Sequence, residues 1–391
     1  MSQQDWHLIS SYAGILILAT FSVYAGSFGS LKAPRSAKGK KDSGDDDSEQ
    51  EDEEVPERVT TSEALLFPIL GSITLFGLYL IVKFLGVEWI NWLLGWYFAF
   101  VGIISVWKCS ISIAVTLLGK GYWRSFKIRK LELPKFIDPK GTSVVSMRTP
   151  SIVLLFPSLI PSILYSYQTG PKKSALITDI LALSFAHNSL SLIKLDRFQT
   201  GIILLSGLFL YDIWWVFGTE VMVTVGTSLD APIKILWPKS YLFSIERGFT
   251  MLGLGDIVVP GLFISLALRF DLNNSAHKTP NKPFIKPYFI SAIIAYVVGL
   301  STTIVVMSVF KAAQPALLYL SPACILSFLI TAYSRNELNV AWEWDDNDAK
   351  PAEEKEPVKD ICDLDSNESV VLAEADPLDE EYIVRNRLHL N

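Results

Sequence analysis

The chain has 391 residues, of which 50% are hydrophobic and only 19% are charged, and its mean hydropathy is +0.34. These values are too apolar for a soluble protein of this length and indicate a membrane protein. The net charge is −6, and the four His and three Cys show no CxxC, HxxxH or HExxH spacing, which argues against zinc, iron or a disulfide framework. No Walker or GxGxxG sequence occurs, which argues against the usual nucleotide-binding sites. We expect no metal, no cofactor and no nucleic-acid partner.

The acidic residues are concentrated in two segments. Residues 42–57 hold ten acidic and no basic side chains, and residues 336–391 hold seventeen acidic and five basic ones. Both segments are poor in aromatic and β-branched residues and cannot bury a core. We therefore expect an acidic disordered loop within 31–63 and a disordered acidic tail over 336–391. A solubilising role is favoured for the tail over the binding of a basic partner.

Apolar runs of about 20 residues, the length needed to cross a bilayer, recur along the chain. They predict an all-α polytopic membrane protein with nine transmembrane helices. The fourth run is weaker because Pro157 and Pro161 interrupt it, but proline is tolerated in membrane helices. The first run follows Asp5 rather than a basic region, so it does not resemble a cleavable signal peptide. The nine runs lie at 8–28, 64–86, 89–118, 151–168, 174–195, 199–220, 246–268, 286–310 and 314–334.

The basic residues predict the orientation of these spans. With nine spans, the loops on one side hold 20 Lys or Arg and those on the other side hold seven at most. Basic loops face the cytosol, so we expect a lumenal N-terminus and a cytosolic C-terminus. The sequons at Asn273 and Asn367 then fall on the cytosolic side and should be unused. The predicted organisation is a first span over 1–30, a loop over 31–63, spans two to five over 64–198, spans six to nine over 199–335, and a tail over 336–391.

Two carboxylates lie inside strongly apolar runs, where an ionisable group is costly and a functional role is the first hypothesis. Asp212 lies in LFLYDIWWVFG, fifteen residues after Arg197, and Asp256 lies in MLGLGDIVVPG, thirteen residues before Arg269. At the helical rise these separations are about 22 and 20 Å, so the two carboxylates share a depth to within one turn. Adjacent antiparallel helices would bring them face to face.

Most other polar residues in the spans have structural explanations, and Lys108 in mid-span has none. Lys83 lies near a span end and can extend to the interface. Asp179 lies about five residues, or roughly 7 Å, into its span, within reach of the interface. His187 and Asn188 are in mid-span, and we expect them to make structural hydrogen bonds rather than to bind a ligand.

Two facing carboxylates share one proton, because both cannot easily be ionised together. The charged member can take a proton from water while the neutral member donates to a carbonyl oxygen, which is a scheme for hydrolysis. Paired carboxylates also carry protons in transporters. Spacing alone therefore supports a protease and a proton-coupled transporter equally.

Further small motifs surround the pair. Gly253 and Gly255 permit close backbone approach or non-helical backbone beside a cavity, although small residues are also common where membrane helices pack. The run Gln314-Pro315-Ala316-Leu317 opens the last span. Proline in a first helical turn is ordinary, so this run carries no function by itself.

Together these residues resemble the signal peptide peptidase family of intramembrane aspartyl proteases, which is related to presenilin. Tyr211-Asp212 matches the YD motif, Gly253-Leu254-Gly255-Asp256 matches GxGD, and Pro315-Ala316-Leu317 matches PAL. The resemblance runs from about residue 56 to 335. It implies a presenilin-like endoplasmic reticulum protein that cleaves transmembrane segments in type II orientation, including leftover signal peptides. Asp212 and Asp256 would be the catalytic dyad, and the other motif residues, with Gln314, would shape the site.

A peptide bond inside a helix is shielded, so the substrate must be unwound locally before water can attack it. Free backbone groups near Gly253, Gly255 and Pro315 are expected to pair with the unwound strand, as in strand addition. A proton-coupled transporter and an adaptor in membrane-protein degradation remain as alternatives, and the sequence leaves open homo-oligomers and degradation-machinery partners. Some relatives end in a dilysine retrieval signal, whereas this chain ends in RLHLN.

Overall fold

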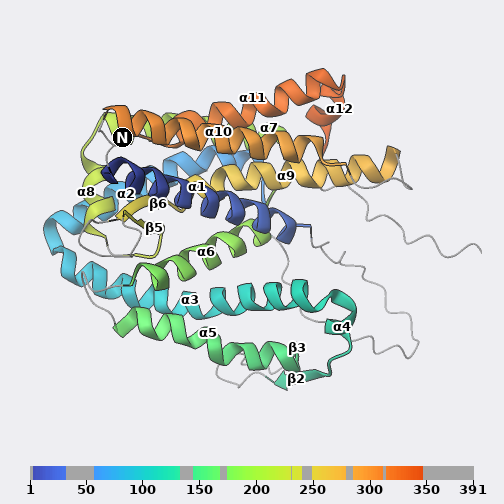
Figure 1. Ribbon diagram of the computed structural model, residues 1–391, viewed down its shortest axis with the longest axis horizontal. Helices are drawn as coiled ribbons and strands as arrows, with labels where there is room; N and C mark the ends of the chain where they lie inside the picture. The colour runs from blue at the N-terminus through green and yellow to red at the C-terminus, as the bar shows by residue number, and fades with distance from the viewer. Residues whose placement is uncertain are drawn as a thin grey trace, which may run out of the picture. The chain divides into compact units, whose positions relative to one another are not determined.

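The computed structural model describes residues 3–31, 57–132, 144–167, 174–229, 231–239, 249–278, 285–310 and 314–346 (Figure 1). Most of the acidic loop and of the acidic tail lies outside these residues. Within them the chain is mostly helical, so the predicted all-α class is confirmed. The long helices are α1 (Gln3–Gly29), α2 (Thr61–Leu85), α3 (Val87–Leu118), α5 (Thr149–Tyr167), α6 (Ala175–Leu192), α7 (Phe198–Phe217), α9 (Gly255–Lys278), α10 (Pro287–Phe310) and α11 (Leu317–Ser334).

Eight helices in the described part of the chain are long and apolar enough to cross a membrane, which is every long helix except α9. Helix α9 carries Asp256, Arg269 and Asp271, and these charges separate it from the apolar helices. It nevertheless packs against α1, α7, α10 and α11. The weak fourth run forms one continuous helix, α5, through Pro157 and Pro161, as predicted.

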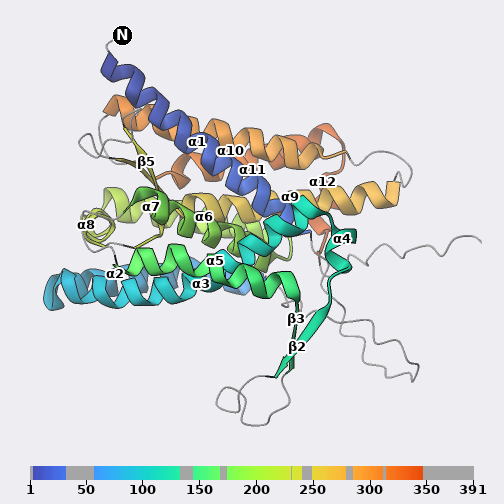
Figure 2. The ribbon, with the colours of Figure 1, turned by 60° about the horizontal axis from the view of Figure 1, so that its bottom comes forward.

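Short elements connect the long helices. Helices α4 (Lys120–Arg124), α8 (Val221–Ser228) and α12 (Leu338–Glu343) are single turns or little more. Strands β1 (Glu57–Val59) and β4 (Ile193–Leu195) pair in parallel. Strands β2 (Ile128–Glu132) and β3 (Val144–Arg148) form an antiparallel hairpin, which follows α4 (Figure 2). Strands β5 (Lys234–Pro238) and β6 (Phe249–Gly253) form a second antiparallel pair.

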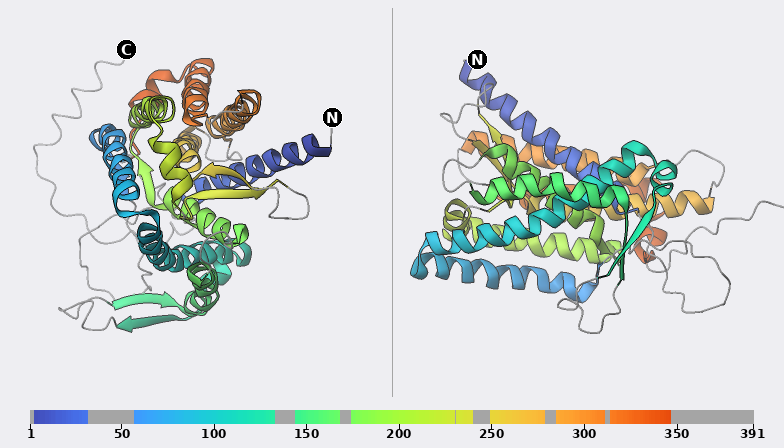
Figure 3. Two further views of the ribbon diagram at one scale, coloured as in Figure 1. Left: turned by 90° about the vertical axis from the view of Figure 1, so that its left-hand side faces the viewer. Right: turned by 90° about the horizontal axis from the view of Figure 1, so that it is seen from below.

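The span predicted at 246–268 is wrong at its start. Residues 249–253 form strand β6, and helix α9 begins only at Gly255 and continues to Lys278. These residues form a strand because they pair along their whole length with β5, whose residues are distant in sequence. Figure 3 shows the two yellow strands close to α1 and to the green helices, and strand β5 contacts both α1 and α6.

Aromatic rings pack α7, α9 and α11 together. Phe198 of α7 stacks on Phe328 of α11, with ring centroids 4.2 Å apart and an angle of 20° between the planes. Phe198 also meets Phe263 of α9 at 5.8 Å, and all three rings are buried. Gly201 permits this approach, because a Cβ there would lie 2.7 Å from the Phe263 ring. Small residues at such crossings are typical of membrane helices.

Large apolar side chains cover the outside of the bundle. Ile73 of α2 is 64% exposed and Leu117 of α3 is 81% exposed. Such a surface would be a liability in water but is the expected surface of helices that contact lipid.

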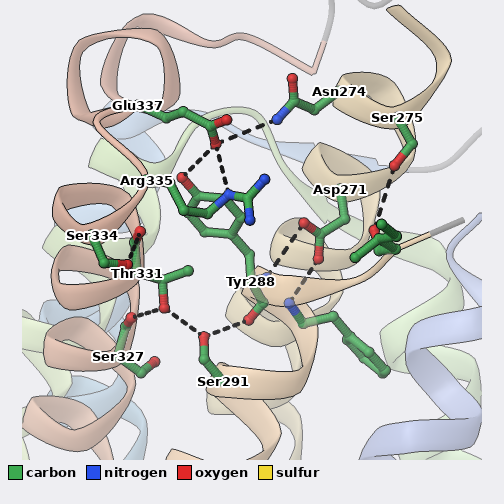
Figure 4. A network of polar contacts seen from close by, with 12 residues as sticks. Asp271, Asn274, Ser275, Tyr288, Ser291, Ser327, Thr331, Ser334, Arg335 and Glu337 are labelled. Atoms are coloured by element: carbon green, nitrogen blue, oxygen red, sulfur yellow. Dashed lines mark hydrogen bonds and ion pairs between the residues drawn. The ribbon is translucent and has the colours of Figure 1, made fainter. Parts of the chain in front are cut away.

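A polar network ties α9, α10 and the end of α11 together (Figure 4). It lies at the end of the bundle remote from β5 and β6 (Figure 1). The Asp271 carboxylate accepts the backbone N–H groups of Tyr288 and Phe289, at 3.3 and 2.8 Å, and so caps α10. The Tyr288 hydroxyl donates to Glu337 at 3.1 Å, and Asn274 donates to the same carboxylate at 3.4 Å.

The tail predicted to be disordered from residue 336 is ordered as far as Asp346, so the predicted boundary is wrong. Asp345 pairs with Arg197 at 2.7 Å, and Asp346 pairs with Arg269 and with Arg58, each at 3.3 Å. Acidic composition indicated a solvated segment, but Arg58 of β1, Arg197 before α7 and Arg269 within α9 hold these two carboxylates. Residues 347–391 lie outside the described residues.

Candidate active site

Asp212 lies fifteen residues into α7 and is only 4% exposed. Its Oδ2 atom accepts the backbone N–H of Leu317 at 3.2 Å. Leu317 is the first residue of α11, where backbone N–H groups have no partner within the helix. The buried carboxylate therefore caps α11 from another helix.

The run from Gln314 to Leu317 is brought directly to Asp212. Pro315 and Ala316 precede α11, and their carbonyl groups accept the first backbone bonds of that helix. Pro315, Ala316 and Leu317 are buried, and Gln314 is half-buried. The proline fixes the entry of the chain into α11 without leaving an N–H group of its own to satisfy. Its neighbour Leu317 supplies the donor to the carboxylate.

Asp256 lies in the first turn of α9, three residues after the end of β6, and not within a long apolar helix as predicted. Its carboxylate accepts a hydrogen bond from the Gly253 backbone. A Cβ on Gly253 would lie 3.2 Å from Asp256 Oδ2, whereas a Cβ on Gly255 would meet nothing within 4 Å. The two glycines of this motif therefore differ, because a Cβ at Gly253 would crowd the carboxylate and one at Gly255 would not.

Leu254 joins β6 to α9. Its backbone N–H donates to the Ile233 carbonyl at 2.8 Å, which extends the sheet by one bond. Its carbonyl accepts the N–H groups of Ile257 and Val258, which begins the helix. The buried Tyr296 hydroxyl of α10 donates to the Asp256 carbonyl at 3.4 Å. The backbone around Asp256 is thus fixed from three sides.

The structure brings Asp212 and Asp256 together. Helices α7 and α9 pack against each other, and the two carboxylates are close enough to interact electrostatically. Asp256 is partly exposed, whereas Asp212 is buried. Two neighbouring carboxylates in a medium of low dielectric favour a state that holds one proton between them. Such a pair can act as a combined acid and base.

The Tyr211 ring, next in sequence to Asp212, packs toward α2. Its ring packs with Trp215, at 6.3 Å between centroids, and lies 3.4 Å from the Cβ position of Gly71 in α2. The Trp215 ring in turn donates to Ser72 of α2 at 3.0 Å. Tyr211 therefore holds α7 against α2, and successive residues of one helix face two different neighbours.

Sequence reasoning did not predict three of the interactions at this site. The Leu317 N–H and the Tyr296 hydroxyl give no sequence signal, because their acceptors are far along the chain. Asp179 was visible as a carboxylate inside a span, but it reaches the backbone of β5 instead of the interface: its Oδ1 accepts the Leu236 N–H at 2.7 Å. His187 and Asn188 hydrogen-bond to serines of α3, as structural residues would.

No group of three or more His, Cys, Asp or Glu side chains within the described ranges is arranged to hold a metal ion. Among the described residues, the site contains two carboxylates, each with a backbone donor, beside a two-stranded sheet. The edge of β6 that faces away from β5, its free edge, pairs with no other described strand.

The family model for signal peptide peptidase matches residues 49–348. The chain is similar to signal peptide peptidase of Mus musculus, with 37% identity over 88% of this chain and 86% of the relative. It is equally similar to signal peptide peptidase of Homo sapiens, with 37% identity over 87% of this chain and 84% of the relative. A Schizosaccharomyces pombe protein named "Probable intramembrane protease" is 37% identical over 80% of this chain and 92% of its own length.

Proposed function

Because this chain belongs to the signal peptide peptidase family of intramembrane aspartyl proteases, we propose that Asp212 and Asp256 are its catalytic dyad. The protein is an aspartic endopeptidase that acts on transmembrane helical segments. The observation that carries the proposal is the meeting of the two carboxylates from α7 and α9 beside the start of α11. A pair with this placement can hydrolyse a peptide bond without a covalent intermediate.

The reaction needs one proton on the pair. The charged carboxylate takes a proton from a water molecule as its oxygen attacks the carbonyl carbon of the substrate, and the neutral carboxylic acid donates its proton to the carbonyl oxygen. The resulting tetrahedral diol collapses when a proton passes to the amide nitrogen and the C–N bond breaks. The Leu317 and Gly253 N–H groups hold the two carboxylates in place through this cycle.

The free edge of β6 is suited to bind the unwound substrate. In an antiparallel pair of strands, opposed residues alternate between two arrangements. In one, the two residues exchange backbone hydrogen bonds; in the other, their N–H and C=O groups point away from the partner strand. Leu236 points its N–H toward Asp179, so its partner Met251 points its own backbone groups away from β5. Met251 is 53% exposed and lies two residues before Gly253. A substrate strand added here would run past the dyad.

A cysteine in place of Leu254 tests this binding mode. Without substrate it should react with a water-soluble thiol reagent, and a bound substrate strand should protect it. Complete protection without substrate would count against a wet cleft at this position.

We place the protein in the endoplasmic reticulum membrane with a lumenal N-terminus and a cytosolic C-terminus. The 20-to-7 asymmetry of the basic residues supports this orientation. An engineered sequon near Ser228 should therefore gain a glycan, and the native sequon at Asn367 should gain none. Glycosylation at Asn367 would overturn the orientation.

Purified protein incubated with a labelled signal peptide tests the function directly. Mass analysis should find products cut within the apolar segment for the wild type, and none for Asp256→Ala. Glu88→Gln, which alters an exposed carboxylate in the first turn of α3, is the matched control and should cleave normally. A proton transporter would yield no peptide product from any of the three proteins, so the same assay separates the two alternatives.

A further inference from the structure

A third carboxylate reaches the active-site region without touching the dyad. Asp179 lies in the second turn of α6, and its Oδ1 atom accepts the N–H of Leu236, the central residue of β5, at 2.7 Å. This is a short bond to an acidic side chain, the kind that is stronger than a bond between neutral groups. A carboxylate is costly inside an apolar helix, so the contact calls for a reason beyond packing.

The register shows which edge of the sheet Asp179 occupies. Leu236 of β5 lies opposite Met251 of β6. The Leu236 N–H donates to Asp179 and not to β6, so the backbone groups of both residues point away from the partner strand. Asp179 thus closes the outer edge of β5. The opposite edge, at Met251, remains for a substrate.

The sheet leads from this contact to the dyad. Leu254, directly after β6, bonds back to the Ile233 carbonyl, and the Gly253 backbone bonds to the Asp256 carboxylate. On the other side, the Ser11 hydroxyl of α1 contacts the Thr250 hydroxyl of β6 at 2.5 Å. Figure 3 shows β5 and β6 close to α1 and to the green helices. A displacement of β5 would therefore displace β6, the strand that leads to the dyad.

We propose that Asp179 is a positioning residue, which holds the β5–β6 sheet against α6 so that the free edge of β6 is already in place when a substrate unwinds. The inference rests on the proposed function and extends it to a residue outside the three motifs. A two-stranded sheet is marginally stable by itself, and ordering it only when substrate arrives would weaken binding and turnover. Anchoring one edge removes that cost.

The test compares Asp179→Ala with Asp179→Asn. The amide oxygen of Asn can still accept the Leu236 N–H, whereas Ala cannot. For a helical transmembrane substrate, kcat/KM should fall about tenfold to a hundredfold in Asp179→Ala, as expected when a hydrogen bond to a charged group is lost, and should largely recover in Asp179→Asn. Thr178→Val removes a hydroxyl that donates to the Ser174 carbonyl at the start of α6 and not to the sheet, so it should match the wild type.

A second variant removes the donor instead of the acceptor. Leu236→Pro deletes the N–H that faces α6, at an edge where proline is tolerated. It should lose a similar fraction of kcat/KM, and the double variant Asp179→Ala/Leu236→Pro should lose little more than either alone, because both remove one interaction. Binding of a small tetrahedral diol that contacts only the dyad should stay unchanged in all of them.

The outcomes separate this inference from the function it rests on. If the wild type makes no product, the proposed function fails. If the wild type cleaves, Asp256→Ala does not, and Asp179→Ala cleaves at the wild-type rate, only the positioning role fails. Additive losses in the double variant, or loss of folding in both single variants, would also overturn it and leave a purely structural contact.

Discussion

Substitutions of Asp212 should separate its chemical role from its structural one. The Leu317 N–H at 3.2 Å needs an acceptor, and Asp212 is 4% exposed, so water cannot readily replace the carboxylate. Asp212→Asn keeps an oxygen at that place, whereas Asp212→Ala leaves a buried donor without a partner. The expected cost of the latter is about 1 to 3 kcal/mol of folding free energy.

Catalysis should be lost in both variants. A positioned acid or base contributes about 10² to 10⁴-fold, and removing one member of a coupled pair is often worse because neither carboxylate can do both tasks. Turnover of a labelled signal peptide should therefore fall to background in Asp212→Asn and in Asp212→Ala. An inhibitor that mimics the tetrahedral diol should bind only the wild type.

Hydrogen exchange followed by mass spectrometry reports the structural difference. A peptide that spans Gln314 to Leu320 should exchange as slowly in Asp212→Asn as in the wild type, and faster in Asp212→Ala. Equal exchange and equal unfolding midpoints for the two variants would refute the capping of α11 by Asp212. The dyad itself is falsified if either variant still cleaves at near the wild-type rate.

Three further predictions follow from contacts near the site and at the opposite end of the bundle. Gly253→Ala should lower turnover, since its Cβ would lie 3.2 Å from the Asp256 carboxylate. Gly255→Ala should change turnover little, because a Cβ there meets nothing within 4 Å. Equal losses of turnover in the two variants would contradict this difference. Truncation after Asp346 should preserve cleavage. Truncation after Trp344 should lower the unfolding midpoint, because it removes the carboxylates that pair with Arg197, Arg269 and Arg58. An unchanged midpoint after the shorter truncation would refute the role of these pairs. Burial, and then the neighbouring Arg269, lower the pKa of Lys194 to about 8. Between about pH 8 and 10.5 this lysine is therefore protonated in the unfolded chain but not in the folded one, so the free energy of unfolding should rise with pH in this range. Unfolding measured over this pH range should show a smaller rise in Lys194→Met.

Much of the candidate site is encoded in short stretches of sequence. Asp212 and Asp256 stand out because a carboxylate in an apolar run is costly wherever it lies, and their common depth follows from counting residues at a fixed helical rise. That estimate survives the correction to the span, because the residues from Asp256 to Arg269 all lie in α9. The glycines and the Pro315 run are equally visible in sequence.

The elements that were wrong depend on partners far along the chain. Residues 249–253 form a strand because β5 pairs with them, and a short apolar run cannot reveal whether it is helix or strand. Asp345 and Asp346 are ordered because Arg197, Arg58 and Arg269 converge on them, which acidic composition could not indicate.

The sequence by itself determined that the chain is an all-α membrane protein with two costly carboxylates at one depth, because hydropathy and helical rise are properties of local sequence. Only the tertiary structure decided which backbone groups those carboxylates bind, that Tyr211 faces α2, and that Asp179 closes the edge of β5. A hydrogen bond needs two partners within about 3 Å of each other, and residues more than fifty positions apart meet only when the helices pack.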